Sequence, residues 1–170
     1  MKHVSTLRAL FLISIFVLSA CTTSSAGFDA KRADEYTNKP TRLAIMMDFG
    51  SNMDKLGNNL PGKMTAFLAA CGVESSFDRI SDLNIGPLKA SLTNPDAVLI
   101  VRWKSETKTG YGLIEADYHF ELTDVATKKV VWKANLQFHP GADNWADVFA
   151  QTVMKGMKGT ALLPASCNIA

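Results

Sequence analysis

The chain has 170 residues, of which 47% are hydrophobic, and it carries 18 lysines and arginines against 16 acidic residues. The surplus of two positive charges is Lys2 and Arg8, so residues 21–170 hold 16 charges of each sign. A chain of this length suits one domain with a proper core. Its balanced charge excludes nucleic-acid binding through a basic patch.

The first 20 residues have the composition of a secretory signal. A basic head with Lys2 and Arg8 precedes an apolar run from Ala9 to Val17, and the small residues Ser19 and Ala20 follow. The apolar run is too short for a permanent membrane span, which needs about 20 residues. Residues 1–20 are therefore predicted to be removed.

The four residues "LSAC" at 18–21 resemble the bacterial lipobox. The resemblance implies that Cys21 receives a diacylglycerol and becomes the first residue of the mature chain, with further acylation such as palmitate. An ordinary signal peptide with a coincidental cysteine is the alternative. Thr22, rather than Asp, follows the cysteine, which in enterobacterial lipoproteins implies export to the outer membrane. The expected location is the periplasmic face of the outer membrane.

Two further cysteines, Cys71 and Cys167, remain if Cys21 is acylated. In an oxidising compartment an even pair can form a disulfide bond. Alternatively, Cys71 is a small buried apolar residue. Both interpretations stay open from the sequence.

The first part of the mature chain is predicted to contain a tether followed by a strand and a helix. Residues 21–40 are small, polar and charged, which is typical of a flexible tether. A buried strand over 43–49, a helix mainly over 60–71 and a short strand over 73–77 follow, with Gly72 ending the helix.

The second part begins with one or two short helical pieces over 78–96 and an apolar strand at 97–101. Two-residue alternation of apolar and polar residues over 114–122 and again over 130–138 predicts an antiparallel hairpin with one wet face. A last helix should begin after an N-cap at Asp143 and stop near Gly159. Residues 41–170 thus form a single α+β domain: a two-layer sandwich with a mixed sheet of about five strands in the order β-α-β-α-β-β-β-α, with helices on one face.

This order and the stretch "ELTDVATKKVVWKANLQF" resemble small envelope lipoprotein domains. These are the domains of the curli-secretion lipoprotein, the penicillin-binding-protein activators and the N-terminal part of the Tol translocation protein. The shared pattern is a strand ending in Leu-x-Asp and a return strand opening with Val-Trp, here Leu122, Asp124, Val131 and Trp132. The resemblance implies an anticodon-binding-like fold and an accessory role in the cell envelope, with no catalytic residues.

No constellation of catalytic or metal-binding residues can be assembled from the sequence. If Leu122 pairs with Val130, His119 faces Lys133, and His139 lies about 20 Å away, too far to share a metal ion. Glu115, Asp117 and Glu121 form a carboxylate row on the same wet face, which is typical of a solvated surface. We expect no enzyme activity, cofactor or metal. Two of Asp48, Asp54, Asp78 and Asp82 together in a cleft would revive an enzyme hypothesis.

The stretch 103–118 offers the best candidates for partner binding. Trp103 and Tyr111 flank a segment that reads as a polar loop, with Arg102 and Lys104 beside it. Exposed aromatic residues near a loop are typical interface anchors, although the alternative in which Trp103 caps the core is favoured over an anchor. The sequence thus predicts a lipid-anchored, non-enzymatic accessory subunit that binds envelope proteins or a polymer, with homo-oligomerisation left open. The alternative is a periplasmic small-ligand-binding or inhibitor module.

Overall fold

The structure is a computed structural model that describes residues 23–50, 54–80, 92–110, 112–141 and 143–169. Eight elements follow one another along the chain: β1 (Ser25–Arg32), β2 (Arg42–Met47), α1 (Asp54–Ala70), β3 (Glu74–Arg79), β4 (Ala97–Thr109), β5 (Gly112–Asp124), β6 (Val130–His139) and α2 (Trp145–Gly159). Cys21 and Tyr111 lie outside the described residues.

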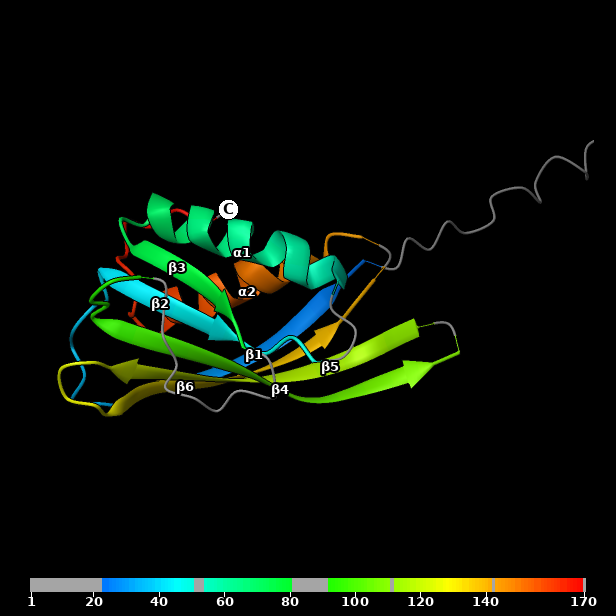
Figure 1. The fold of residues 1–170 in the computed structure, drawn as a ribbon, viewed down its shortest axis with the longest axis horizontal. Helices are drawn as coiled ribbons and strands as arrows, with labels where there is room; N and C mark the ends of the chain where they lie inside the picture. Colours follow the sequence, from blue (N-terminus) through cyan, green and yellow to red (C-terminus); the bar gives the residue numbers. More distant parts are fainter. Residues whose placement is uncertain (1–22, 51–53, 81–91, 111, 142, 170) are drawn as a thin grey trace, which may run out of the picture.

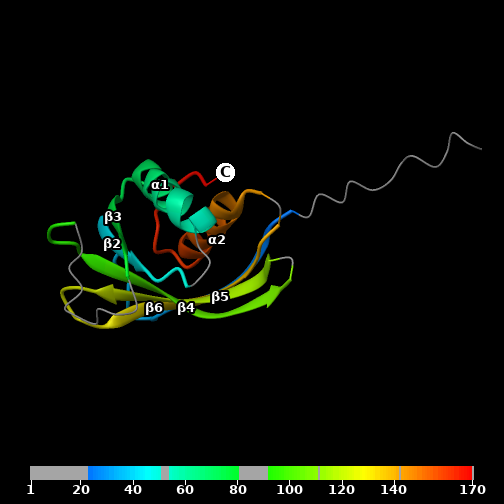
Figure 2. The same cartoon turned by 45° about the vertical axis from the view of Figure 1, so that its right-hand side comes forward.

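The six strands form one mixed sheet in the order β1-β6-β5-β4-β2-β3. β2 pairs in parallel with both β3 and β4, and the other neighbours are antiparallel. Both helices cover the same face, and Figures 1 and 2 show the opposite face without a helix. The α+β class, the mixed sheet and the helices on one face are confirmed.

The numbers of strands and helices differ from the prediction. The sheet has six strands rather than five, and the described residues contain two helices rather than three. Of the region 78–96, in which short helices were expected, Asp78 and Arg79 end β3, residues 81–91 lie outside the described part, and 92–96 are not helical. α1 begins six residues earlier than predicted, because Pro61 is accommodated inside the helix instead of starting it.

Apolar side chains from the sheet and both helices meet in one core. Phe149 of α2 lies at its centre, with ring centroids 5.1 Å from Tyr118, 5.8 Å from Phe138 and 6.1 Å from Phe120. The alternation in β5 and β6 predicted the middle of this face correctly, because Tyr118, Phe120 and Leu122 are fully buried. It was wrong at its ends, because Ile114 and Val130, which the same pattern placed inward, are exposed. Two-residue periodicity therefore placed the hairpin's inner face against the helices.

The predicted flexible tether over 21–40 is wrong, since β1 occupies its middle. β1 pairs with β6 along its whole length, from Ser25 opposite His139 to Arg32 opposite Trp132. Ala26, Phe28 and Ala30 turn towards the helices, and the ring of Phe28 lies 5.8 Å from Phe120 and 6.0 Å from Trp132. Two of these three inward residues are alanines, so their apolar alternation is weak and the segment reads as polar.

Gly156 makes room for Phe28. A Cβ placed on Gly156 would overlap the Phe28 ring, so the absence of a side chain lets β1 pack directly against α2. A glycine inside a helix costs about 1 kcal/mol relative to alanine. Here that cost accompanies a close strand–helix contact, which fastens the edge strand to the domain.

Leu122, Asp124 and Trp132, three of the residues that carry the resemblance, stabilise the end of the sheet at the β5–β6 turn. Leu122 is fully buried, and Trp132 Nε1 donates to Thr160 Oγ1 at 2.9 Å, linking β6 to the end of α2. Asp124 Oδ1 accepts from Thr127 N at 2.7 Å and from Thr127 Oγ1 at 2.8 Å, which closes the β5–β6 turn. Because these hydrogen bonds favour the carboxylate, the pKa of Asp124 is lowered.

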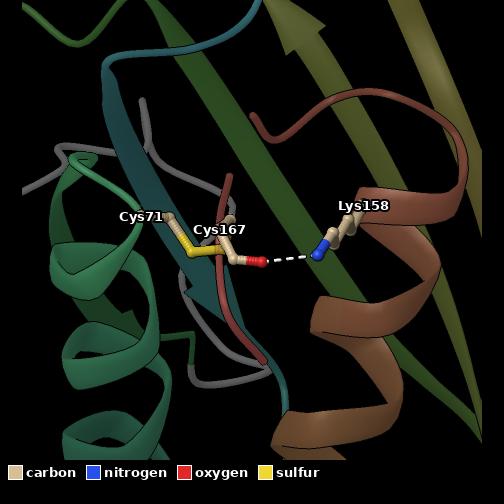
Figure 3. The surroundings of a disulfide bond; sticks show 3 residues. All are labelled: Cys71, Lys158 and Cys167. Carbon is tan, nitrogen blue, oxygen red and sulfur yellow. Dashed lines mark hydrogen bonds between the residues drawn. A yellow bond between two sulfur atoms is a disulfide. The ribbon is translucent and has the colours of Figure 1, made fainter. Parts of the chain in front are cut away.

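Cys71 and Cys167 are joined by a disulfide bond in the structure, with their Cα atoms 4.7 Å apart. Figure 3 shows Cys71 after the end of α1 and Cys167 on the C-terminal tail. The carbonyl oxygen of Cys167 accepts a hydrogen bond from Lys158 Nζ on α2. The disulfide bond spans 96 residues of sequence. It thereby connects α1 to the tail, which adds the buried Leu162 and Leu163 to the core.

We expect Gly156→Ala to destabilise the protein although alanine is the better helix former. The added Cβ must displace Phe28, and overpacking of this kind costs about 1–3 kcal/mol, which exceeds the helix gain. Gly62→Ala in α1 is the control, because its Cβ would meet nothing within 4 Å and should stabilise by up to about 1 kcal/mol. Urea unfolding measures both, and a stabilising Gly156→Ala would show that β1 does not pack tightly on α2.

Replacing both Cys71 and Cys167 with serine should lower the free energy of unfolding by about 2–4 kcal/mol, since a long loop is no longer closed in the unfolded chain. Urea unfolding in a Cys21→Ser background gives this value. In the same background, thiol titration of the unfolded protein should find no free thiol before reduction. Two free thiols at that stage would contradict the bond.

Asp124→Asn should destabilise the protein at neutral pH by about 1–2 kcal/mol, because hydrogen bonds to a charged acceptor are the stronger ones. The folded-state pKa is lowered, so the carboxylate's extra stability is present above its ordinary value of 3.8 and is lost as the pH falls below it. The stability gap between wild type and variant should therefore narrow below about pH 4. Denaturation measured from pH 3 to 7 tests this, and a constant gap would contradict it.

Candidate functional site

The sheet face opposite the helices is a mostly polar surface that several strands form together. We call it the open face. It is built from alternating residues of four neighbouring strands, which Figure 2 shows side by side. Its members are Gly27, Asp29 and Lys31 of β1, Lys133, Asn135 and Gln137 of β6, Glu115, Asp117, His119 and Glu121 of β5, and Ile100, Arg102, Lys104, Ser105 and Thr107 of β4.

Cross-strand contacts organise the centre of the open face. Leu122 pairs with Trp132, and a register shift follows between Leu122 and Thr123, so the predicted pairing of Leu122 with Val130 is wrong by two residues. His119 consequently faces Asn135, and its Nδ1 donates to Asn135 Oδ1 at 2.9 Å. Two differences add up: Thr123, rather than Leu122, pairs with Val130, and one extra residue in β6 then forms a bulge that moves every later pair by one more.

Glu121 is the best-bonded carboxylate of this face. Lys133 Nζ lies 3.0 Å from Glu121 Oε1, and His119 Nε2 lies 3.5 Å from the same atom. The hydrogen bond from Lys133 is the main cause of a lowered pKa for Glu121, and His119 adds to it. Glu121 therefore stays ionised and is suited to fixing neighbouring side chains rather than to giving up a proton.

The other carboxylates of β5 are also bonded across strands. Gln137 Nε2 donates to Glu115 Oε1 at 3.0 Å, and Ser105 Oγ donates to Asp117 Oδ2 at 2.7 Å. His139 Nδ1 lies 3.7 Å from Glu115 Oε2. Such a network holds a polar surface in one arrangement and presents fixed donors and acceptors to a partner.

A shallow hollow of about 490 Å³ lies on the open face. Asp29, Asp117, Lys104, Asn135 and Gln137 contribute side chains to it, and Gly27 contributes backbone. A Cβ on Gly27 would meet nothing within 4 Å, so the glycine leaves this part of the surface clear. Gly27 and Asp29 were missed from the sequence because their segment was interpreted as a tether. The weak alternation around Phe28 was the available signal.

Three of the four predicted partner-binding residues can be placed. Arg102 and Lys104 are exposed, and Lys104 lines the hollow at a register shift in β4. The stretch around them is not a loop, because β4 continues to Thr109 and β5 begins at Gly112. Tyr111 lies outside the described residues. The predicted loop is thus replaced by a long hairpin.

Trp103 faces the helix side of the sheet rather than the open face. It pairs with Tyr118, and a Cβ on Gly50 would lie 2.8 Å from its ring. Its Nε1 is buried and has no hydrogen-bond partner within the described residues. The alternative in which Trp103 caps the core describes its position better than an exposed anchor does.

The acidic residues considered for catalysis are bonded separately. Asp48 Oδ1 accepts from Gly50 N at 2.9 Å, and Asp78 Oδ2 accepts from Ser76 Oγ at 3.3 Å. The side chain of Asp54 and all of Asp82 lie outside the described part. Burial raises the pKa of Tyr118, with Glu106 and Asp48 adding to the effect, so its phenol stays protonated. Among the residues described, no group of three or more metal-binding side chains comes together.

A second hollow, of about 430 Å³, lies between α1 and the start of α2. Lys63 and Asp147 form an ion pair at 2.6 Å across it.

The N-cap of α2 is Asn144 rather than the predicted Asp143. Asn144 adopts a left-handed conformation with φ 65° and makes no capping hydrogen bond through its side chain. Neither helix, over the part of the chain described, is long and apolar enough to span a bilayer.

Comparisons with known proteins place the fold but not the family. No family model and no curated protein matches the chain. Among solved structures, it is similar to the dodecamer of a PelC variant from Paraburkholderia phytofirmans, with 18% identity, 81% of this chain and 96% of that chain covered, and a TM-score of 0.50. A second PelC dodecamer structure from the same organism matches with 16% identity, the same coverage and a TM-score of 0.49. At this level of identity, the likeness shows a shared fold alone.

Proposed function

We propose that this protein is a lipoprotein, anchored through acylated Cys21 at the periplasmic face of the outer membrane, that serves as a non-enzymatic accessory subunit of a cell-envelope complex. The observation that carries the proposal is the small number of residues between the lipobox and the start of the folded domain. Ser24 Oγ accepts from Gly141 N at 2.9 Å and donates to the Asp143 carbonyl at 2.8 Å. An anchor at Cys21 would therefore hold the domain against the membrane.

The open face supports a binding role. Its charges are of both signs, and most of its carboxylates are already bonded to neighbours, which suits recognition by fixed hydrogen-bonding groups better than acid–base chemistry. The hollow is lined by the polar residues Asp29, Lys104, Asp117, Asn135 and Gln137 together with Phe28, Tyr118 and Leu136, and it is shallow and open to solvent. Small-molecule sites usually bury most of the surface of their ligand, so an extended partner, an envelope protein or polymer, fits this shallow surface better.

We include homo-oligomerisation in the proposal. The similar structure at TM-score 0.50 is described as a dodecamer. Each acylated subunit of such an assembly must reach the same membrane, which a dihedral arrangement does not allow. An oligomer of this chain would therefore be cyclic, with its axis normal to the membrane. The resemblance to the small envelope lipoprotein domains is part of the same proposal.

The anchor is tested by mass and by fractionation. Expressed with its signal, the full chain should lose residues 1–20, gain the mass of a diacylglycerol and acyl chains, and partition with outer membranes. Cys21→Ser should abolish the acyl mass and the membrane partitioning. The Cys71→Ser, Cys167→Ser double variant is the control and should keep both. A mature protein without lipid would contradict the proposal.

The binding surface is tested by photo-crosslinking in cells. A crosslinking amino acid at Asp29, exposed on the open face, should capture a reproducible envelope component or a second copy of this chain. The matched control is Ala66, exposed on α1 on the opposite side of the molecule. Equal capture at both positions, or capture at neither, would argue against the open face as the binding surface.

A further inference from the structure

The β4–β5 hairpin extends beyond the rest of the sheet. The last pair between β5 and β6 joins Ala116 to Phe138, and β6 ends at His139. β4 and β5 remain paired beyond this level, through Lys108 opposite Leu113 to Thr109 opposite Gly112. Three residue steps separate Glu115, next to the last β5–β6 pair, from Gly112. At the usual rise of a strand the hairpin projects about 10 Å beyond β6.

The hairpin projects from the end of the sheet at which the mature chain begins. Ser25, the first residue of β1, pairs with His139, the last residue of β6. In both Figure 1 and Figure 2 the end of the hairpin and the start of β1 lie at the same end of the sheet, opposite the β5–β6 turn. The two hydrogen bonds of Ser24 hold the chain at this end.

The chain before β1 is short compared with this projection. Four residue steps lead from Cys21 to Ser25, and a fully extended chain covers at most about 14 Å in four steps. A membrane that holds acylated Cys21 thus lies within about 14 Å of the level of Ser25, and the end of the hairpin at Gly112 fills about 10 Å of that distance. Ile114 lies two residue steps, about 7 Å, behind Gly112, so it reaches the interfacial layer when the end of the hairpin spans that layer. The interfacial layer of a bilayer is itself about 5–8 Å thick on each side.

The hairpin also carries an apolar side chain near its end. Ile114 is 48% exposed, and the other strongly exposed large hydrophobic residues of the described chain, Val125 and Val130, belong to the opposite end of the sheet. The charged side chains near Ile114 form no basic cluster, because Lys108 pairs with Glu106, and Glu115 contacts Gln137 and His139. A contact made here would therefore depend on apolar burial rather than on attraction to anionic lipid.

From this geometry we infer that the end of the β4–β5 hairpin, through Ile114, makes a second contact with the lipid surface that holds Cys21. The inference rests on the proposed acylation of Cys21. Two points of contact, the anchor and the hairpin, fix the tilt of the domain, so the strands stand upright on the membrane. The open face then runs away from the bilayer instead of lying against it.

The test uses the acylated protein in vesicles of phosphatidylethanolamine and phosphatidylglycerol. Ile114→Cys and Val125→Cys each introduce a single reactive thiol, because Cys21 is acylated and Cys71 is bonded to Cys167. Val125 is the matched control, with 42% exposure at the other end of the sheet. Each variant carries a nitrobenzoxadiazole probe, and co-sedimentation with the vesicles is recorded alongside.

The fluorescence emission of the probe at position 114 should shift to shorter wavelength when vesicles are present. In vesicles of brominated lipids its fluorescence intensity should fall roughly two-fold, as expected for a side chain in the interfacial layer. The shift should persist at high salt, and position 125 should not respond. If the protein sediments but position 114 is silent, the inference fails and the anchor stands. If the protein does not sediment, the anchor and the inference both fail.

Two further outcomes would overturn the inference in other ways. Equal quenching at positions 114 and 125 would mean that the domain lies flat on the bilayer. A response at position 114 that needs added membrane proteins, and is absent with protein-free vesicles, would mean that the hairpin binds a protein or a second copy instead of lipid.

Discussion

The packing of Phe28 against Gly156 is the contact on which the arrangement of the whole molecule depends. It attaches β1 to α2 and so makes β1 the edge strand of a six-stranded sheet. Without it, β1 would be held mainly by pairing with β6 and by the hydrogen bonds of Ser24, and an edge strand of eight residues is weakly held by pairing alone. The same contact places Gly27 and Asp29 on the open face, because their neighbours on either side turn inward.

The sequence predicted the parts of the fold whose patterns are strong and local. The β5–β6 hairpin was found because apolar and polar residues alternate over most of nine positions in each strand, so Tyr118, Phe120 and Phe138 could be assigned to the core. The start of β4 followed from its uninterrupted apolar run. The end of α2 at Gly159 followed from a glycine after the last apolar turn.

The parts of the fold that were predicted wrongly depend on contacts between distant residues. The inward face of β1 contains two alanines, and only the notch at Gly156, more than a hundred residues away, shows why Phe28 belongs to the core. The register of β6 could not be counted because the bulge after Leu122 has no sequence mark. β4 was predicted to end early because its second half is polar on both faces, and alternation cannot identify a strand that projects beyond the core.

The candidate site is therefore less visible in the sequence than the fold. Lys104 and Arg102 were singled out for their position next to two aromatic residues, yet Trp103 packs over Gly50, and the polar groups that accompany Lys104 come from β1, β5 and β6. A surface assembled from four strands has no local motif, since each strand contributes alternate residues only. The sequence does give the position of Cys21. The structure makes this position more informative, because Ser24, three residues later, is already part of the domain.

The short distance between Cys21 and β1 also restricts how a partner can meet the open face. A long tether would let the domain turn freely, and any face could then approach the membrane or another protein. If Cys21 is acylated, only four residue steps separate the anchor from a strand that is paired along its length, and the proposed contact of the hairpin with lipid would align β1 with the membrane normal. A chain bound along the hollow and parallel to the strands would then run towards or away from the bilayer. Such an orientation suits a partner that leaves or enters the membrane better than one that spreads along its surface.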